Sequence, residues 1–242
     1  MPIMLITGFV MLYLLGGIAS MTTAWLFKKR ILGGDMLPFY MELPPYRFPS
    51  VKSVLLSMWD SAKAFLHKAG TIILGTSIVL WFLLNLPPRT GEIANMDAAT
   101  GSAYVLDHSF AAAIGRFIQP IFGPLGFDWR ICVGLIGAMA AREVFVATMG
   151  QIFAAGNPDS PADAIRTAVW TSGPHQGELL FTPPTIAALL VFFAFALLSM
   201  STVATIRREN NSWRWAAVAW GYMFALAWIG ALVARYVTMW LT

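Results

Sequence analysis

Four long apolar stretches constrain the fold of this chain more than any other feature. They cover residues 3–27, 69–86, 184–206 and 213–240. Each approaches or exceeds the roughly 20 apolar residues that a helix needs to cross the hydrocarbon core of a bilayer. Only 12% of the 242 residues are charged, about half the share that is typical of soluble domains. The sequence therefore predicts an all-α, polytopic helical membrane protein.

The charges between these stretches predict how the chain is oriented. Between Lys28 and Lys68, seven Lys or Arg residues stand against three acidic residues. Because basic residues collect on the cytoplasmic side of membrane proteins, we expect this segment in the cytoplasm. The loops at 89–109 and 155–183 carry more acidic than basic residues, so we expect both of them outside.

The pattern divides the chain into four segments. Residues 1–30 are predicted to form a first transmembrane helix with a basic cytoplasmic end. Residues 31–68 hold a proline-rich stretch and an amphipathic helix from Val51 to Ala69, which suits the membrane interface. A solvated linker helix is the alternative for that amphipathic segment. Residues 69–170 hold a span and an interrupted apolar segment, and residues 171–242 hold an exterior loop and two C-terminal transmembrane helices.

The interrupted segment, residues 110–151, is predicted to be a hairpin. Since both flanking loops are expected outside, this segment must return to the side from which it starts, either by crossing fully or by re-entering. Pro120 and Pro124 predict irregular backbone within it. Irregular backbone at membrane depth is tolerated where it is buried in protein or lines a cavity, and transporters build midplane sites from such broken helices.

The stretch from Trp129 to Gln151 carries Arg142 and Glu143 side by side near its middle. A charge at the centre of a membrane helix costs about 2.5–3.5 kcal/mol on insertion scales. Adjacent residues on a helix point about 100° apart, so this pair cannot neutralise itself well. Two interpretations stay open: the pair marks a functional site, or it bonds to neighbouring helices and fixes the fold.

Other candidates are weaker. Met139 lies near the same depth, but methionine is also an ordinary core residue. Ser199 and Ser201 could offer oxygen contacts, or could bond back to a carbonyl of their own helix. His175 and Glu178 lie three residues apart in an exterior loop and could capture ions at an entrance.

Three blocks of the sequence resemble one family. They are MELPPYRFPS at 41–50, QPIFGPLGFDWRICVGLIGAMAAREVFVATMG at 119–150 and STVATIRRE at 201–209. In this order and at this spacing they resemble the ferrous iron transporter B family. The resemblance implies that residues 69–170 are the second gate repeat, of the kind also found in nucleoside transporters. It further implies a permease of the bacterial inner membrane that carries Fe(II) as its transported ion and holds no permanently bound cofactor.

The chain also differs from that family. Members begin with a GTPase domain and a first gate repeat, whereas no G-x-x-x-x-G-K-[ST] phosphate loop occurs in these 242 residues. We therefore expect a non-enzymatic C-terminal portion that works with a GTPase-bearing remainder, either a separate chain or a missing segment. Leu198 and Ser199 stand where members usually have Pro-Cys, and Arg142 stands where members usually have lysine.

These expectations assign roles to the charged pair. Glu143 is the only acid predicted deep within a span, so it is the first candidate for coordinating or steering a divalent cation. Arg142 would act as a gate or as a counter-ion to another acid, because a permanent positive charge repels a cation.

Two further functions compete with iron transport: a gate-type carrier of another solute such as a nucleoside, and a non-transporting membrane scaffold. A homodimer would restore a pair of gate repeats. The expected partners are therefore the lipid bilayer, the GTPase-bearing remainder and a second copy of the chain. Nucleic acid is not expected as a partner, because the sequence holds no basic run suited to binding it.

Overall fold

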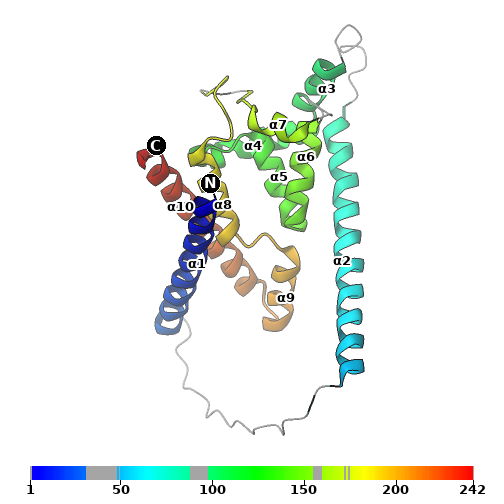
Figure 1. Cartoon of the computed structure of the whole chain (residues 1–242), viewed down its shortest axis with the longest axis vertical. Coiled ribbons are helices and arrows are strands. Elements are labelled where there is room, and N and C mark those ends of the chain that lie inside the picture. The colour runs from blue at the N-terminus through cyan, green and yellow to red at the C-terminus, as the bar shows by residue number, and fades with distance from the viewer. Residues whose placement is uncertain are drawn as a thin grey trace. The chain divides into compact units, whose positions relative to one another are not determined.

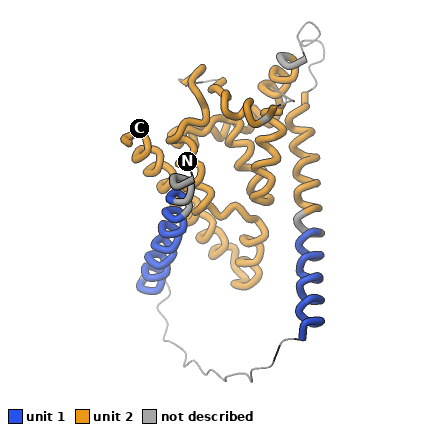
Figure 2. The backbone as a smooth tube through the Cα atoms, in the orientation of Figure 1, with its two compact units in different colours: residues 1–66 blue, residues 67–242 orange. Residues whose placement is uncertain are grey.

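The computed structural model describes residues 2–30, 48, 50–87, 98–154, 160–171, 173 and 175–241. Within these ranges the secondary structure is helical except for one isolated β-bridge, between Val169 and Leu179 (Figure 1). The chain divides into two compact units, residues 1–66 and 67–242 (Figure 2). Each unit is described by itself below.

The first unit holds helix α1 (Pro2–Arg30) and the beginning of helix α2 (Val51–Asn85). Helix α1 covers the first predicted span. Helix α2 runs without a break for 35 residues and covers both the amphipathic segment predicted at 51–69 and the span predicted at 69–86. The two segments join because neither proline nor a turn sequence separates them. Apart from Phe48 and Ser50, the predicted proline-rich stretch at 35–50 lies outside the described residues.

The second unit begins with the end of α2 and continues through a group of short helices. These are α3 (Ala98–Asp107), α4 (Phe110–Phe122), the 3-10 helix η1 (Gly123–Leu125), α5 (Trp129–Ala140), α6 (Glu143–Ala154) and α7 (Pro161–Arg166). Ser109 caps the start of α4, where its Oγ accepts from the Ala112 N–H at 3.1 Å.

The chain bends by 102° between the α4–η1 segment and α5. Gly126 makes this turn with φ +83°, a conformation that favours glycine. Asp128 then caps α5 by accepting from the Ile131 N–H at 3.0 Å. The predicted irregular backbone after Pro120 is therefore present, and it takes the form of a sharp corner.

Three helices complete the second unit: α8 (Pro183–Phe195), α9 (Met200–Asn210) and α10 (Trp213–Leu241). Helix α10 confirms the predicted span at 213–240. The predicted span at 184–206 is present but is not one helix, because residues 196–199 are non-helical and separate α8 from α9. Helices α8 and α10 pack closely: Ala227 and Ala231 of α10 are fully buried, and Phe192 of α8 contacts Phe224 edge to face at 6.0 Å.

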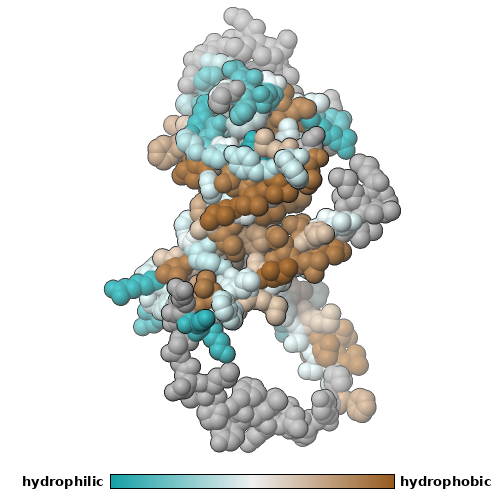
Figure 3. Space-filling model, turned by 90° about the vertical axis from the view of Figure 1, so that its left-hand side faces the viewer, coloured by the Kyte–Doolittle hydropathy of each residue, from teal (hydrophilic) through white to brown (hydrophobic). Residues whose placement is uncertain are grey.

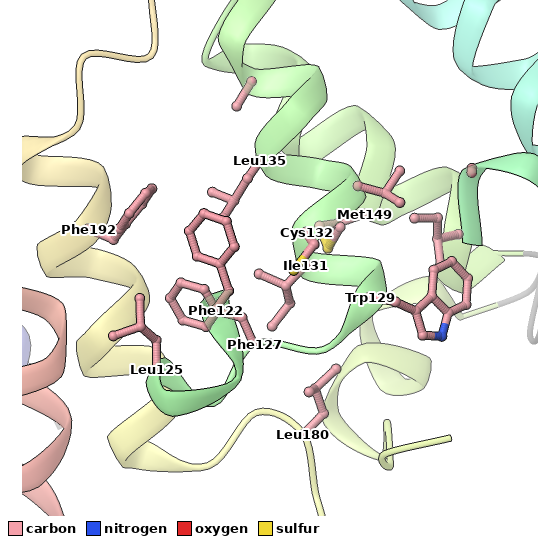
Figure 4. Packing of buried hydrophobic residues seen from close by; sticks show 14 of the residues in the cluster. Phe122, Leu125, Phe127, Trp129, Ile131, Cys132, Leu135, Met149, Leu180 and Phe192 are labelled. Atoms are coloured by element: carbon pink, nitrogen blue, oxygen red, sulfur yellow. The ribbon is translucent and has the colours of Figure 1, made fainter. Parts of the chain in front are cut away.

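Aromatic and aliphatic side chains from α4, η1, α5 and α8 form the core of this unit (Figure 4). Phe127, Phe192, Leu125 and Ile131 have almost no exposed surface. Many large apolar side chains remain exposed, and they form broad patches on the face shown in Figure 3. Within the described residues, four segments are long and apolar enough to cross a membrane: 10–29, 51–85, 183–210 and 213–241. The prediction of an all-α, multi-pass membrane protein is confirmed.

Candidate functional site

Helices α5 and α6 form a tight antiparallel hairpin (Figure 1). A Cβ atom on Gly134 of α5 would lie 2.6 Å from Cε of Met149, and one on Gly137 would lie 3.1 Å from Oγ1 of Thr148. The two glycines therefore let α6 approach α5 closely. The chain reverses at Ala141, which is extended with φ −156° and ψ 139°. The expectation of one helix from Trp129 to Gln151 was wrong, because the chain reverses at Ala141. The segment predicted as one hairpin over 110–151 contains two changes of direction: the 102° bend before α5 and this reversal.

The tip of this hairpin consists of Ala141, Arg142 and Glu143, so the two predicted charges lie at a chain reversal and not in the middle of a helix. Glu143 is the first residue of α6, where its negative charge is favoured by the helix dipole. Its side chain is exposed and has no hydrogen-bond or ion-pair partner in the described part of the chain. Arg142 does not pair with it: its Nη2 donates to the carbonyl oxygen of Ala196 at 3.0 Å.

The carbonyl that accepts from Arg142 belongs to the break between α8 and α9. The backbone is extended at Ala196 (φ −66°, ψ 132°) and at Ser199 (φ −136°, ψ 100°). Ser199 then starts α9, with its Oγ accepting from the Thr202 N–H at 3.3 Å. The hairpin tip and the broken span therefore meet, and together they form the candidate site.

The hydroxyl groups beside the break bond to one another. Ser199 Oγ lies 2.9 Å from Ser201 Oγ and accepts from the Thr202 hydroxyl at 3.1 Å. In this arrangement the Ser199 hydroxyl caps α9, and within the described residues neither serine hydroxyl bonds back to a carbonyl of the preceding turn. The structure thus brings Ser199 and Ser201 together and places them at the end of the break.

Backbone carbonyls at the ends of α5 and α8 lack hydrogen-bond partners among the described residues. At the end of α8, the Ala196 N–H bonds to the Phe192 carbonyl at 2.8 Å. The three carbonyls that follow, those of residues 193–195, accept no hydrogen bond within the described residues. The same holds for the carbonyls of residues 138–140 at the end of α5. Sequence analysis missed these groups because a backbone acceptor leaves no signal in the sequence.

Met139 does not point to a metal centre. It lines an apolar cavity of about 300 Å³ beside the break, whose wall also includes Cys132, Leu198, Trp220 and Phe224. Cys132 is fully buried there as a free thiol. The described residues contain no group of three or more His, Cys, Asp or Glu side chains that could hold a metal ion by themselves. An ion at the tip would need oxygen atoms from the backbone or from further chain.

The two candidates in the loop that was expected outside do come together. His175 Nδ1 lies 3.0 Å from Glu178 Oε2, in a turn where Gly177 has φ +88°. The His175 ring also lies 5.8 Å from the Trp170 ring, beside a cavity of about 510 Å³ that Arg116 helps to line. Both His175 and Glu178 are exposed, and they belong to a different part of the unit from the hairpin tip.

A buried ion pair holds the base of the hairpin, and sequence analysis missed it. Arg130 Nε donates to Asp128 Oδ2 at 2.5 Å, and Arg130 Nη2 donates to the Val169 carbonyl at 2.5 Å. Trp129 adds a bond from its indole N–H to Thr171 Oγ1 at 3.0 Å. These contacts fasten α5 to the loop that precedes α8. The signal available was Asp128 directly before an apolar helix, a typical N-cap position.

A paired-helix hairpin whose tip meets a broken span defines a gate-type helical membrane domain. Two family models match the chain: "Ferrous iron transport protein B C terminus" over residues 9–60 and "Gate: Nucleoside recognition" over residues 66–213. The chain therefore belongs to the Gate family, within the C-terminal membrane region of the Fe(2+) transporter FeoB family.

Curated relatives agree with this assignment. The chain is 40% identical over 217 residues to the Fe(2+) transporter FeoB of Leptospira interrogans, covering 89% of this chain and 31% of the relative. It is 34% identical over 243 residues to an Fe(2+) transport protein A/FeoB fusion protein of Porphyromonas gingivalis, covering 90% and 29%. It is 33% identical over 219 residues to FeoB of Staphylococcus aureus, covering 90% and 29%. No solved structure gives a significant match.

The chain thus spans less than a third of the length of these relatives. The predicted family resemblance is confirmed, as is a multi-pass location in the bacterial inner membrane.

Proposed function

We propose that this chain forms part of a ferrous iron permease, in which the ion passes between the tip of the α5–α6 hairpin and the break between α8 and α9. One observation carries the proposal: the Glu143 carboxylate, which has no partner among the described residues, lies at the point where two interrupted helices meet. Broken helices supply midplane sites in secondary transporters. The printed names of the relatives, which are Fe(2+) transporters, support iron as the cargo.

The chemistry of the tip suits transient binding. Fe(II) accepts carboxylate oxygen, and a single carboxylate with neutral oxygens holds an ion loosely enough to release it. Glu143 supplies the charge, and the hydroxyls of Ser199 and Ser201 supply neutral oxygens once their mutual hydrogen bonds open. Met139 lines an apolar cavity, and its thioether suits Cu(I) better than Fe(II), so we assign it no ligand role. His175 and Glu178 are proposed to collect cations at the exterior entrance.

The proposal also concerns partners. Because the relatives are much longer than this chain, we infer that transport involves a GTPase-bearing remainder of the transporter. The exposed tip of the hairpin would then face that remainder or a second copy of the chain. We propose no enzymatic activity for these 242 residues, and no resident cofactor.

Uptake of radiolabelled Fe(II) tests the proposal. Cells that lack their own ferrous iron uptake system would express this chain with the GTPase-bearing remainder, as wild type or as E143Q. We expect E143Q to lower uptake at least tenfold at equal membrane abundance. The matched control is E209Q, which removes an exposed carboxylate from the far end of α9.

Three results would overturn the proposal. Normal uptake by E143Q would remove Glu143 from the ion path. Saturable uptake of a labelled nucleoside that Fe(II) does not inhibit would favour a nucleoside carrier; the description of the Gate family model names nucleoside recognition. If the complex assembled normally and carried neither solute, the chain would be a scaffold.

A further inference from the structure

Two helices end beside the same side chain. Helix α5 ends at Ala140, two residues before Arg142, and α8 ends at Phe195, next to the Ala196 carbonyl that accepts from the Arg142 guanidinium at 3.0 Å. Arg142 therefore links the two helix ends: its backbone follows the end of α5 by two residues, and its guanidinium lies at the end of α8. Met139 of α5 and Ala196 line the same cavity. No acidic side chain shares this position: the neighbouring Glu143 has no ion-pair partner within the described residues.

The C-terminal ends of helices favour a positive charge. Each helix C-terminus carries a partial charge of about −0.5, so two of them supply about −1. The carbonyls of residues 138–140 and 193–195 accept no hydrogen bond within the described residues, which leaves their negative ends available. The guanidinium of Arg142 carries the matching charge of +1. In water such carbonyls would be solvated, whereas in a membrane domain they need a donor or a cation.

We propose that the paired ends of α5 and α8 form a binding site for the transported divalent cation, and that Arg142 occupies this site as a tethered cation while the metal ion is absent. This inference rests on the proposed function, which it deepens. The two helix ends together with the Glu143 carboxylate amount to a charge of about −2, which balances a divalent ion. When the ion enters, Arg142 leaves the Ala196 carbonyl and Glu143 turns toward the ion.

A simpler role for Arg142 makes a different prediction. Arginine near a helix C-terminus commonly caps the last carbonyls and stabilises the helix. If Arg142 only caps α8, replacing it weakens the fold and leaves metal affinity unchanged. If Arg142 competes with the ion, replacing it strengthens metal binding. The sign of the affinity change therefore separates the two roles.

Binding of Mn²⁺, a redox-stable divalent probe, supplies this measurement. The full chain in lipid nanodiscs would be titrated while electron paramagnetic resonance records free Mn²⁺, for wild type, R142Q, R142K, E143Q and R142Q/E143Q. We expect R142Q to bind about tenfold more tightly than wild type, because a charge at the helix ends is removed. R142K, which keeps the charge, should stay within about threefold of wild type on the same argument. The matched control is R166Q, which removes an exposed arginine from α7.

The failures of the two proposals are distinguishable. If E143Q weakens Mn²⁺ binding but R142Q does not strengthen it, the proposed ion path stands and Arg142 is only a cap. If R142Q strengthens binding and E143Q has no effect, the helix ends bind the ion and Glu143 is not a ligand. If Na⁺ raises the stability of R142Q against unfolding and Mn²⁺ does not, the assignment of the site to a divalent ion is overturned.

A measurement on the wild-type chain keeps the inference testable if R142Q does not fold. Phenylglyoxal modifies accessible arginines, and peptide mass spectrometry reports the extent at each position. We expect saturating Mn²⁺ to raise modification of Arg142 several-fold, because the ion displaces its guanidinium from Ala196, while Arg166 stays unchanged. Equal modification of Arg142 with and without Mn²⁺ would overturn the inference.

Discussion

Replacing Asp128 with alanine should destabilise the second unit far more than its single charge suggests. Asp128 caps α5 through a 3.0 Å bond from the Ile131 N–H and also neutralises Arg130. Only 1% of the Asp128 side chain and 10% of the Arg130 side chain are exposed, so solvent cannot replace the lost carboxylate. Breaking a buried ion pair by removing one partner costs about 3–5 kcal/mol, and loss of an N-cap costs about 1 kcal/mol.

These two contributions overlap because the same carboxylate makes both contacts, so we expect D128A to lower the free energy of unfolding by about 3–5 kcal/mol. Unfolding by sodium dodecyl sulfate in mixed micelles measures this quantity. The matched control is D163A: Asp163 and Arg166 are 3.8 Å apart with side chains 65% and 81% exposed. Such an exposed pair contributes about 0–1 kcal/mol.

A double variant sharpens this prediction. D128A/R130M removes the unpaired guanidinium together with the carboxylate, so it should be more stable than D128A alone, despite losing two native side chains. The reasoning is refuted if D128A costs no more than D163A, or if the double variant is less stable than D128A. Either result would mean that water reaches Arg130 at the base of the hairpin.

Two further predictions concern packing and capping. G115A should lower the free energy of unfolding by about 1–3 kcal/mol in the same assay, because the added Cβ would lie 2.5 Å from the Trp129 carbonyl oxygen, which is backbone and cannot rotate away. The control G123A adds a Cβ in open space, and an equal cost for the two would contradict the packing argument. S199A removes the hydroxyl that accepts from the Thr202 N–H, so hydrogen exchange in the first turn of α9 should quicken about fivefold or more, as expected for losing a cap of about 1 kcal/mol. Unchanged exchange there would show that the cap is not needed.

Much of the architecture could be predicted because span length and charge bias are summed over many residues. Helices α1 and α10 cover the spans that were predicted from the length of the apolar stretches at 3–27 and 213–240. The charges of the two flanking loops predicted that the chain reverses between residues 110 and 151. Loop charge indicates the side of the membrane on which a loop lies, but it does not locate the point of reversal. The tip at Ala141 lacks proline and glycine, so its local sequence is that of a helix. Reversal there depends on close packing at Gly134 and Gly137, a tertiary effect.

The break in the span at 184–206 was not predictable for a similar reason. Residues 196–199 read Ala-Leu-Leu-Ser and contain no helix breaker. The extended backbone at Ala196 is accompanied by a hydrogen bond from Arg142, which lies 54 positions earlier in the chain. The cost of a buried charge singled out Arg142 and Glu143, and the structure places both at the hairpin tip. That cost could not show that their surroundings are helix ends, because those are made by backbone groups.

A structure determined with Mn²⁺ bound would test the central claim most directly. The anomalous signal of the metal locates it independently of the protein coordinates. We predict a peak within coordination distance of the Glu143 carboxylate and of carbonyls at the ends of α5 and α8, with the Arg142 guanidinium turned away from Ala196. A peak elsewhere in the membrane region, with Arg142 still bonded to the Ala196 carbonyl, would contradict the account.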